Sequence, residues 1–172
     1  MDLLVSYNWS HFSLARPEII AVLERFGDAE PRVEKTATIG IAVAHTRFDN
    51  RDVIKRCRSL WDSDPQNSFE FAIKWVPVDY WCTTEMDAMK QLIVEKIAPR
   101  IGQNESWGMK VHKRRWQKYH TIEIIDYLAT GISQRVDLSH PDWIVWVDVV
   151  GRQTAISLLR PEDIFSLGLP HP

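Results

Sequence analysis

The stretch that decides the fold reads Trp107-Gly-Met-Lys-Val-His-Lys-Arg-Arg-Trp116. After a helix-like segment it continues as Val136-Asp-Leu-Ser-His-Pro-Asp142 and the apolar run Trp143-Ile-Val-Trp-Val-Asp-Val-Val150. Short runs rich in β-branched and aromatic residues predict strands at 107–113, 142–150 and 154–159. Apolar residues at helical spacing predict a helix at 119–132. We therefore expect a compact αβ unit in which a basic strand end precedes a helix and a buried strand.

Positive charge is concentrated at the end of the first of these strands. Five basic residues lie within nine positions, and we call them the basic rim: Lys110, Lys113, Arg114, Arg115 and Lys118. The whole chain of 172 residues has a formal net charge of −2, so the remainder is clearly acidic. A focused basic cluster on an acidic protein is typical of a surface that docks an anionic partner.

Other residues are candidates to extend this surface. His112 lies on the same predicted strand, Lys74 on an earlier strand, and Arg152 in the turn between the last two strands. Trp107 and Trp116 flank the rim, where they either stack on exposed bases or pack at the edge of the core. A solvated charged face is the plainer interpretation of each isolated cation.

The first part of the chain predicts a second small sheet. Strands are expected at 3–9, 33–45 and 69–78, with helices at 17–26 and 50–61 between them, and a bend near Gly40 in the middle strand. This order is typical of a ferredoxin-like sheet. We therefore predict an α/β (α+β) protein with a ferredoxin-like N-terminal domain at 1–78, a C-terminal domain at 83–165 and a tail at 166–172.

Composition excludes several classes of protein. The only cysteines, Cys57 and Cys82, form no CxxC pair, which argues against a disulfide framework and a zinc site. No signal peptide is visible, and no apolar run approaches the roughly 20 residues that span a bilayer. We expect a cytoplasmic protein that binds neither a membrane nor a metal.

No catalytic motif is present. The chain has seven glycines, with no glycine-rich phosphate loop, and it has no nucleophile elbow. Asp142 and Asp148 are carboxylates near one apolar strand, where capping and edge pairing are the expected roles. We therefore predict that the protein is not an enzyme and holds no cofactor.

The last ninety or so residues resemble the THUMP domain, an RNA-binding module of tRNA-modifying proteins. The likeness is carried by Trp107–Arg115, Thr121-Ile-Glu-Ile-Ile-Asp-Tyr-Leu-Ala129 and Trp143–Val150, and most specifically by Val136-Asp-Leu with Pro141-Asp142. THUMP proteins usually place a ferredoxin-like domain before the module. The ending Ala155–Ser166 is similar to that of one subfamily, the stand-alone THUMP adaptor of tRNA cytidine acetylation.

That resemblance implies a function. It implies a non-catalytic protein that binds tRNA, not DNA, at its acceptor 3′ end and presents it to a separate tRNA cytidine acetyltransferase, which forms N4-acetylcytidine. The alternative is an RNA-binding or structural subunit of another tRNA-modifying enzyme, of the methyltransferase, thiolation or pseudouridine type. Because the sequence stops at Pro172, we expect no attached catalytic domain.

Overall fold

The computed structural model describes residues 1–8 and 11–168, which form two compact units. The first contains Met1–Val78 together with residues 162–168, and the second is Asp79–Pro161. The sequence-based expectation that the C-terminal domain runs to residue 165 is therefore wrong. Phe165 is fully buried in the core of the first unit, and 166–168 belong to that unit as well. Residues 169–172 of the predicted tail lie outside the described part of the chain.

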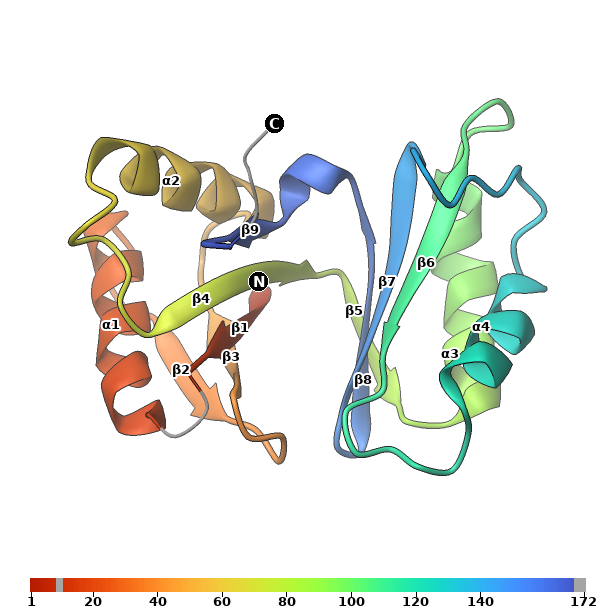
Figure 1. Cartoon of the computed structure of the whole chain (residues 1–172), viewed down its shortest axis with the longest axis horizontal. Coiled ribbons are helices and arrows are strands. Elements are labelled where there is room, and N and C mark those ends of the chain that lie inside the picture. Colours follow the sequence, from red (N-terminus) through yellow and green to blue (C-terminus); the bar gives the residue numbers. More distant parts are fainter. Residues whose placement is uncertain (9–10, 169–172) are drawn as a thin grey trace. The chain divides into compact units, whose positions relative to one another are not determined.

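The first unit is a five-stranded antiparallel sheet with two helices (Figure 1). The strand order is β2-β3-β1-β4-β9, and the elements are β1 (Asp2–Tyr7), α1 (Phe12–Arg25), β2 (Arg32–Lys35), β3 (Ile41–His45), α2 (Asn50–Ser63), β4 (Ala72–Val78) and β9 (Phe165–Ser166). The succession β-α-β-β-α-β from β1 to β4 is the ferredoxin-like motif.

The predicted strand at 33–45 is two strands. β2 and β3 pair antiparallel, with Val33 opposite Ala44. The turn between them contains Gly40, whose φ of 86° favours glycine, and it is held by Thr36, whose hydroxyl donates to the carbonyl of Ile41 at 2.8 Å. Threonine and isoleucine have high β-propensity, so the sequence predicted a bend near Gly40 within one strand and not a turn between two strands.

Both helices of the first unit share one core with the sheet. Alternate residues of β1 (Leu3, Val5 and Tyr7) are buried against Ile19 of α1 and Ile54 of α2. Because successive residues of a strand point to opposite faces, this shared cluster places α1 and α2 on the same face of the sheet. Full burial of one such aliphatic side chain contributes about 1.5–3 kcal/mol.

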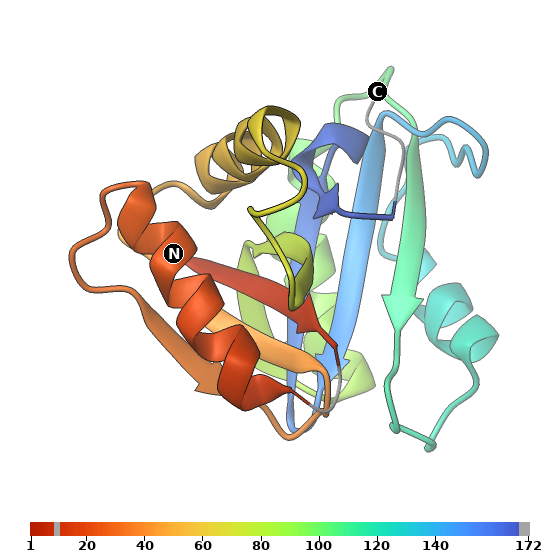
Figure 2. The same cartoon turned by 60° about the vertical axis from the view of Figure 1, so that its left-hand side comes forward.

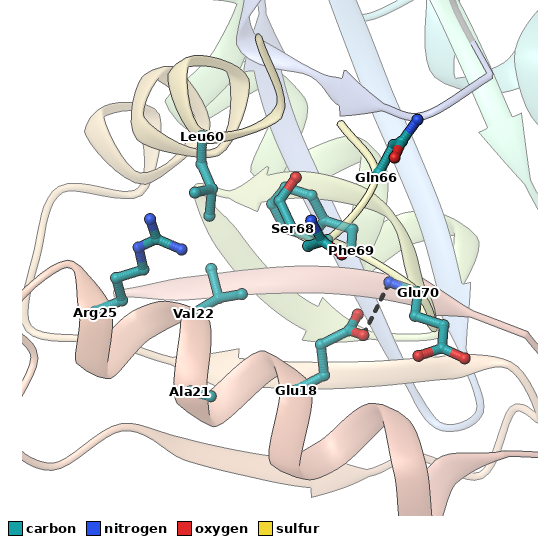
Figure 3. Close-up of a pocket in the computed structure, with 10 residues that line it drawn as sticks. Glu18, Ala21, Val22, Arg25, Leu60, Gln66, Ser68, Phe69 and Glu70 are labelled. Carbon is teal, nitrogen blue, oxygen red and sulfur yellow. Dashed lines mark hydrogen bonds between the residues drawn. The ribbon is translucent and has the colours of Figure 1, made fainter. Parts of the chain in front are cut away.

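Glu18 links α1 to the start of β4. Its carboxylate accepts hydrogen bonds from the backbone N–H groups of Glu70 at 2.9 Å, Phe71 at 3.1 Å and Ala72 at 2.8 Å. The contact with Glu70 lies at the edge of a cavity of about 420 Å³, which Leu60 and Phe69 also line (Figure 3). One side chain on the helix thus satisfies three donors at the point where the strand begins.

We predict that Glu18→Ala lowers the free energy of unfolding by about 1–3 kcal/mol, because it leaves these backbone donors without their charged acceptor. Urea denaturation measures the effect. Glu24→Ala is the matched control, since Glu24 is exposed on the same helix, and we expect it to change stability by less than about 0.5 kcal/mol. Equal stabilities of the two variants would contradict the prediction.

The second unit is a four-stranded mixed sheet in the order β5-β8-β7-β6. β6 and β7 are parallel, whereas the other pairs are antiparallel. Its elements are β5 (Tyr80–Thr83), α3 (Met86–Leu92), a π-helical turn (Ile93–Ile97), a 3-10 turn (Ala98–Arg100), β6 (Trp107–His112), α4 (Thr121–Ala129), β7 (Trp143–Val150) and β8 (Gln153–Leu159). β5 is a strand that the sequence pattern did not predict.

The helices of the second unit cover one face of its sheet. Met89 and Ile93 of the first helical segment and Ile124 of α4 pack on Val145 and Val147 of β7. The intervening residues of β7, including Trp146 and Asp148, therefore point to the opposite face. Within 1–8 and 11–168, the chain has no helix that combines the length and apolarity needed to cross a bilayer.

Candidate nucleic-acid interface

The basic rim lies at the end of β6, at one edge of the second unit's sheet. Since β6 and β7 run in parallel with His112 opposite Asp148, the loop after β6 and the turn after β7 leave the sheet at the same end (Figures 1 and 2). That turn contains Arg152. α4 begins at Thr121, directly after the loop, so its positive N-terminal end lies near the same edge.

Arg114 forms a bidentate ion pair with Asp148 of β7. Its Nε donates to Oδ1 of Asp148 at 2.5 Å and its Nη2 donates to Oδ2 at 3.0 Å. The side chain of Asp148 is only 2% exposed, and that of Arg114 is 25% exposed. A bidentate pair of this kind fixes the guanidinium in position. Because Asp148 already compensates its charge, Arg114 adds less net positive charge to the rim than the sequence suggests, and its contact with RNA stays a prediction.

The loop that follows β6 has an unusual backbone. Arg114 and Arg115 have φ angles of 37° and 53°, in the left-handed region that non-glycine residues rarely adopt. Each such residue costs on the order of 1–3 kcal/mol unless its surroundings hold it there. Here Nζ of Lys113 donates to the carbonyl of Tyr119 at 3.1 Å, and the N–H of Trp116 donates to the carbonyl of Lys113 at 2.9 Å. The loop is thus held from both sides of the two arginines.

The remaining cations are available to an anion. Over residues 1–8 and 11–168, no carboxylate lies within 4.0 Å of the charged groups of four residues: Lys110, Arg115, Lys118 and Arg152. All four are exposed. Nζ of Lys110 lies 6.0 Å from the ring of Trp146, and that of Lys118 lies 5.4 Å from the ring of Tyr119. Cations on a rigid edge are what phosphate recognition requires.

The two flanking tryptophans have different surroundings. Trp107 is 2% exposed, and its indole N–H donates to the carbonyl of Gln134 at 2.9 Å. Of the two roles that the sequence leaves open for Trp107, the structure therefore shows packing in the core. Trp116 is half-buried and packs edge-on against Tyr119, with ring centroids 5.4 Å apart. Sequence reasoning missed Tyr119 as an aromatic residue of this edge, although it directly follows Lys118.

His112 and Lys74 differ from the exposed rim cations. The imidazole of His112 stacks on Trp146, with ring centroids 4.5 Å apart and an interplanar angle of 27°, which makes it part of the packing beneath Lys110. Lys74 lies on β4, opposite Ser166 of β9, and so belongs to the first unit. Its predicted contact with RNA stays a prediction.

The segment from Val136 to Asp142 has a structural role at the other end of β6. The N–H of Asp137 donates to the carbonyl of Trp107, and Asp142 accepts from the N–H of Ser106 at 2.8 Å. A Cβ atom at Gly108 would lie 3.2 Å from the carbonyl oxygen of Asp137, a tight contact that the neighbouring chain would have to relieve by a few tenths of an ångström, so glycine suits this close approach. The motif most specific to the family resemblance therefore holds β6 in place.

Two carboxylates near this end of β6 have lowered pKa values. The backbone N–H groups of His140 and then Ser139 lower the pKa of Asp137. The indole N–H of Trp143, at 2.8 Å, is the largest cause of the lowered pKa of Glu105, followed by the N–H of Gly102. Both carboxylates stabilise turns, and within the described residues no three His, Cys, Asp or Glu side chains gather as a metal site.

Comparison with solved structures identifies the fold. No protein-family model and no curated protein matches the sequence. PH1313 from Pyrococcus horikoshii Ot3 has a similar structure, with a TM-score of 0.63 and 9% identity over 92% of this chain and 55% of that chain. TrmN from Thermus thermophilus has a TM-score of 0.63 and 13% identity over 94% of this chain and 47% of that one.

A third solved structure is a 4-thiouridine synthetase in complex with RNA and ATP. Its TM-score is 0.51 with 15% identity over 92% of this chain and 41% of that chain. The chain has the THUMP-domain fold. The predicted fold class is thereby confirmed. This chain spans about half the length of these THUMP-fold structures, or somewhat less.

We predict that Arg114→Ala lowers the free energy of unfolding by about 1–3 kcal/mol, because it leaves the buried carboxylate of Asp148 without its charged donor. The double variant Arg114→Ala/Asp148→Ala should recover much of this loss, since both partners are then removed. Urea denaturation of the single and double variants measures the coupling. Arg115→Ala is the control for loss of a rim charge. A loss for Arg115→Ala as large as that for Arg114→Ala would show that the ion pair does not hold the loop.

Proposed function

We propose that this protein binds tRNA through its basic rim and acts as a non-catalytic adaptor. In this proposal it presents the acceptor 3′ end to a separate acetyltransferase that forms N4-acetylcytidine. The observation that carries the proposal is the edge of the second unit, where Lys110, Arg115, Lys118 and Arg152 have no carboxylate partner among the described residues. The rest of the chain is acidic, so the positive charge that would attract an anion is concentrated at this edge.

The size of the rim favours a short RNA segment. From Lys110 to Lys118 the chain extends at most about 3.4 Å per residue, which covers only a few nucleotides. Trp116 and Tyr119 offer partly exposed aromatic rings beside the cations, and such rings stack on unpaired bases. A single-stranded end therefore matches the rim better than the long face of a duplex. The crystal structure of a 4-thiouridine synthetase with RNA supports RNA as a ligand of this fold.

We predict that the affinity for tRNA falls with salt at a log–log slope of about −3, because the three exposed rim cations and Arg152 each contribute about −0.7 for a single strand. Arg115→Ala/Lys118→Ala should weaken binding and make the slope shallower by about 1.4. Removing the unpaired 3′ tail of the tRNA should weaken binding to the natural sequence, and the double variant should lose most of this difference. Filter binding at several salt concentrations measures all three quantities.

Lys96→Ala is the matched control for this experiment. Lys96 is exposed in the same unit, near the end of the helical segment that begins with α3. It lies about 15 Å along the helix from Met86, the first residue of α3. We expect it to bind tRNA as the natural sequence does. A salt-independent affinity, or equal binding of intact and trimmed tRNA, would contradict the proposed site.

The second prediction concerns catalysis. With tRNA, acetyl-coenzyme A and a nucleoside triphosphate, the isolated chain should form no modified base. Adding the cognate acetyltransferase should produce N4-acetylcytidine, and this chain should lower the apparent KM for tRNA more than it raises kcat, because an adaptor supplies binding. Nucleoside mass spectrometry measures the product. Acetylation by the chain alone would contradict the adaptor proposal.

An alternative keeps RNA binding but changes the partner. Among the structures with the same fold are TrmN and a 4-thiouridine synthetase, so a subunit of a methyltransferase, thiolation or pseudouridine enzyme is the second candidate. Mass spectrometry of tRNA nucleosides from a strain that lacks this protein separates the two. Loss of N4-acetylcytidine alone supports the acetylation adaptor, and loss of another modified nucleoside supports the alternative.

A further inference from the structure

β6 is an edge strand whose outer backbone groups are open over two of its residues. The N–H of Trp107 donates to Arg135 and its carbonyl accepts from Asp137, whereas the carbonyl of Ser106 accepts from Trp143 on β7. Backbone groups alternate in direction along a strand. The groups of Met109 and Val111 therefore point outward, as those of Trp107 do. Among the described residues, β6 pairs with β7 and, by one bridge at Trp107, with Val136.

The edge is open because the segment before the 136–142 motif leaves it after that bridge. Val136 lies beside Trp107 in a parallel arrangement, and the chain then turns at Asp137, which accepts from the N–H groups of Ser139 and His140. The segment at Val136 thus begins to pair with β6 as a fifth strand would, but the pairing ends after this one residue. An exposed row of donors and acceptors of this kind is a template for pairing with another chain.

A small apolar cavity adjoins the open edge. It has a volume of about 240 Å³ and is lined by Gly108, Met109, Lys110, Leu138, Ser139, Pro141, Ile144 and Pro161, all of the second unit. The absence of a side chain at Gly108 contributes to the space. Cavities that hold small-molecule ligands are usually about 300–1,000 Å³, so this one is better matched to a single side chain of leucine or methionine size.

Two apolar side chains near the open edge are exposed to solvent, and one of them, Leu138, lines the cavity. Leu138 is 84% exposed and Val136 is 53% exposed. Leu138 follows the turn at Asp137 and stands at the wall of the cavity. An apolar pocket with exposed apolar residues next to an unpaired strand edge is the combination that peptide-binding sheets use, because main-chain hydrogen bonds give affinity and a pocket gives specificity.

The charge at this surface indicates what kind of segment it accepts. Lys110 lines the cavity on the same face as Gly108, and in the described residues no carboxylate lies within 4.0 Å of its ammonium group. A strand added beside β6 would place alternate side chains on this face, one toward the cavity and the next toward Lys110. An apolar residue followed two positions later by an acidic residue complements both.

We propose that the open edge of β6 is the docking surface for the partner enzyme, which adds an extended segment as a fifth strand. The segment bonds to the backbone of Met109 and Val111 and places an apolar side chain in the cavity. A carboxylate of the segment faces Lys110, whose ammonium group has three donors and so can meet this carboxylate and an RNA phosphate together. The inference rests on the proposed function, in which a separate enzyme acts on the bound RNA. It gives that enzyme a surface continuous with the rim, because Lys113 directly follows β6.

The test uses the full chain and the tRNA cytidine acetyltransferase from the same organism. Hydrogen–deuterium exchange should show slower exchange at the amides of Met109 and Val111 when the enzyme is added. The amides of Gly108 and Lys110 serve as internal controls, since they already point toward β7, and their exchange should not change. Leu138→Glu should weaken binding of the enzyme about tenfold, the loss expected for a central apolar contact.

The matched variant is Ile122→Glu, because Ile122 is apolar and 61% exposed on α4 of the same unit but does not line the cavity. It should bind the enzyme within twofold of the natural sequence. Both variants should bind tRNA normally and remain folded, as circular dichroism will show. An enzyme that binds without slowing exchange at Met109 and Val111, or that binds Leu138→Glu normally, overturns the docking surface and leaves the adaptor function standing.

Two further outcomes separate the remaining possibilities. If tRNA alone slows exchange at Met109 and Val111, the edge is an RNA surface and the docking proposal is overturned. If tRNA binds at the rim but the enzyme neither binds the chain nor is stimulated by it, the acetylation-adaptor function fails, and the docking surface fails with it.

Discussion

The parallel pairing of β6 with β7 is the constraint on which the second unit depends. Parallel neighbours cannot be joined by a tight turn, so the chain must return from the end of β6 to the start of β7 through a long connection. α4 and the loops on either side of it make that connection. The β6–β7 pair therefore has a different loop at each end of the sheet. The loop that holds β6 lies at one end, and the loop that carries the basic residues lies at the other.

At the second of these ends, electrostatics and backbone geometry support each other. Asp148 is placed by its strand on the face away from the helices, and it fixes Arg114 through two hydrogen bonds. The left-handed backbone at Arg114 and Arg115 would be unfavourable in a free loop. Because one arginine is fixed, the other is carried into solvent with its charge uncompensated among the described residues. A cluster of five similar cations thus divides into residues that build the loop and residues that face outward.

The first unit shows how a domain can depend on a distant part of the sequence. Its four main strands and two helices come from residues 1–78, but its edge strand β9 comes from the other side of the second unit in sequence. Phe165 is fully buried beside Phe69, with ring centroids 5.0 Å apart. The burial of one aromatic ring explains why these last residues join the first unit.

The sequence by itself determined the fold class, the basic rim and the absence of recognised catalytic motifs, because hydrophobic periodicity and clustered charge are local properties. It also predicted α4 and the strands β6, β7 and β8 to within a few residues. Only the tertiary structure decided which of the candidate residues share an edge. Arg114 and Asp148 are 34 positions apart, so their pairing depends on strand register, and the burial of Trp107 depends on a carbonyl at Gln134. The sequence predicted a bend near Gly40 but not the two separate strands on either side of it, because β-propensity does not mark a turn. It missed β9 because two residues gain strand structure only from the edge they join.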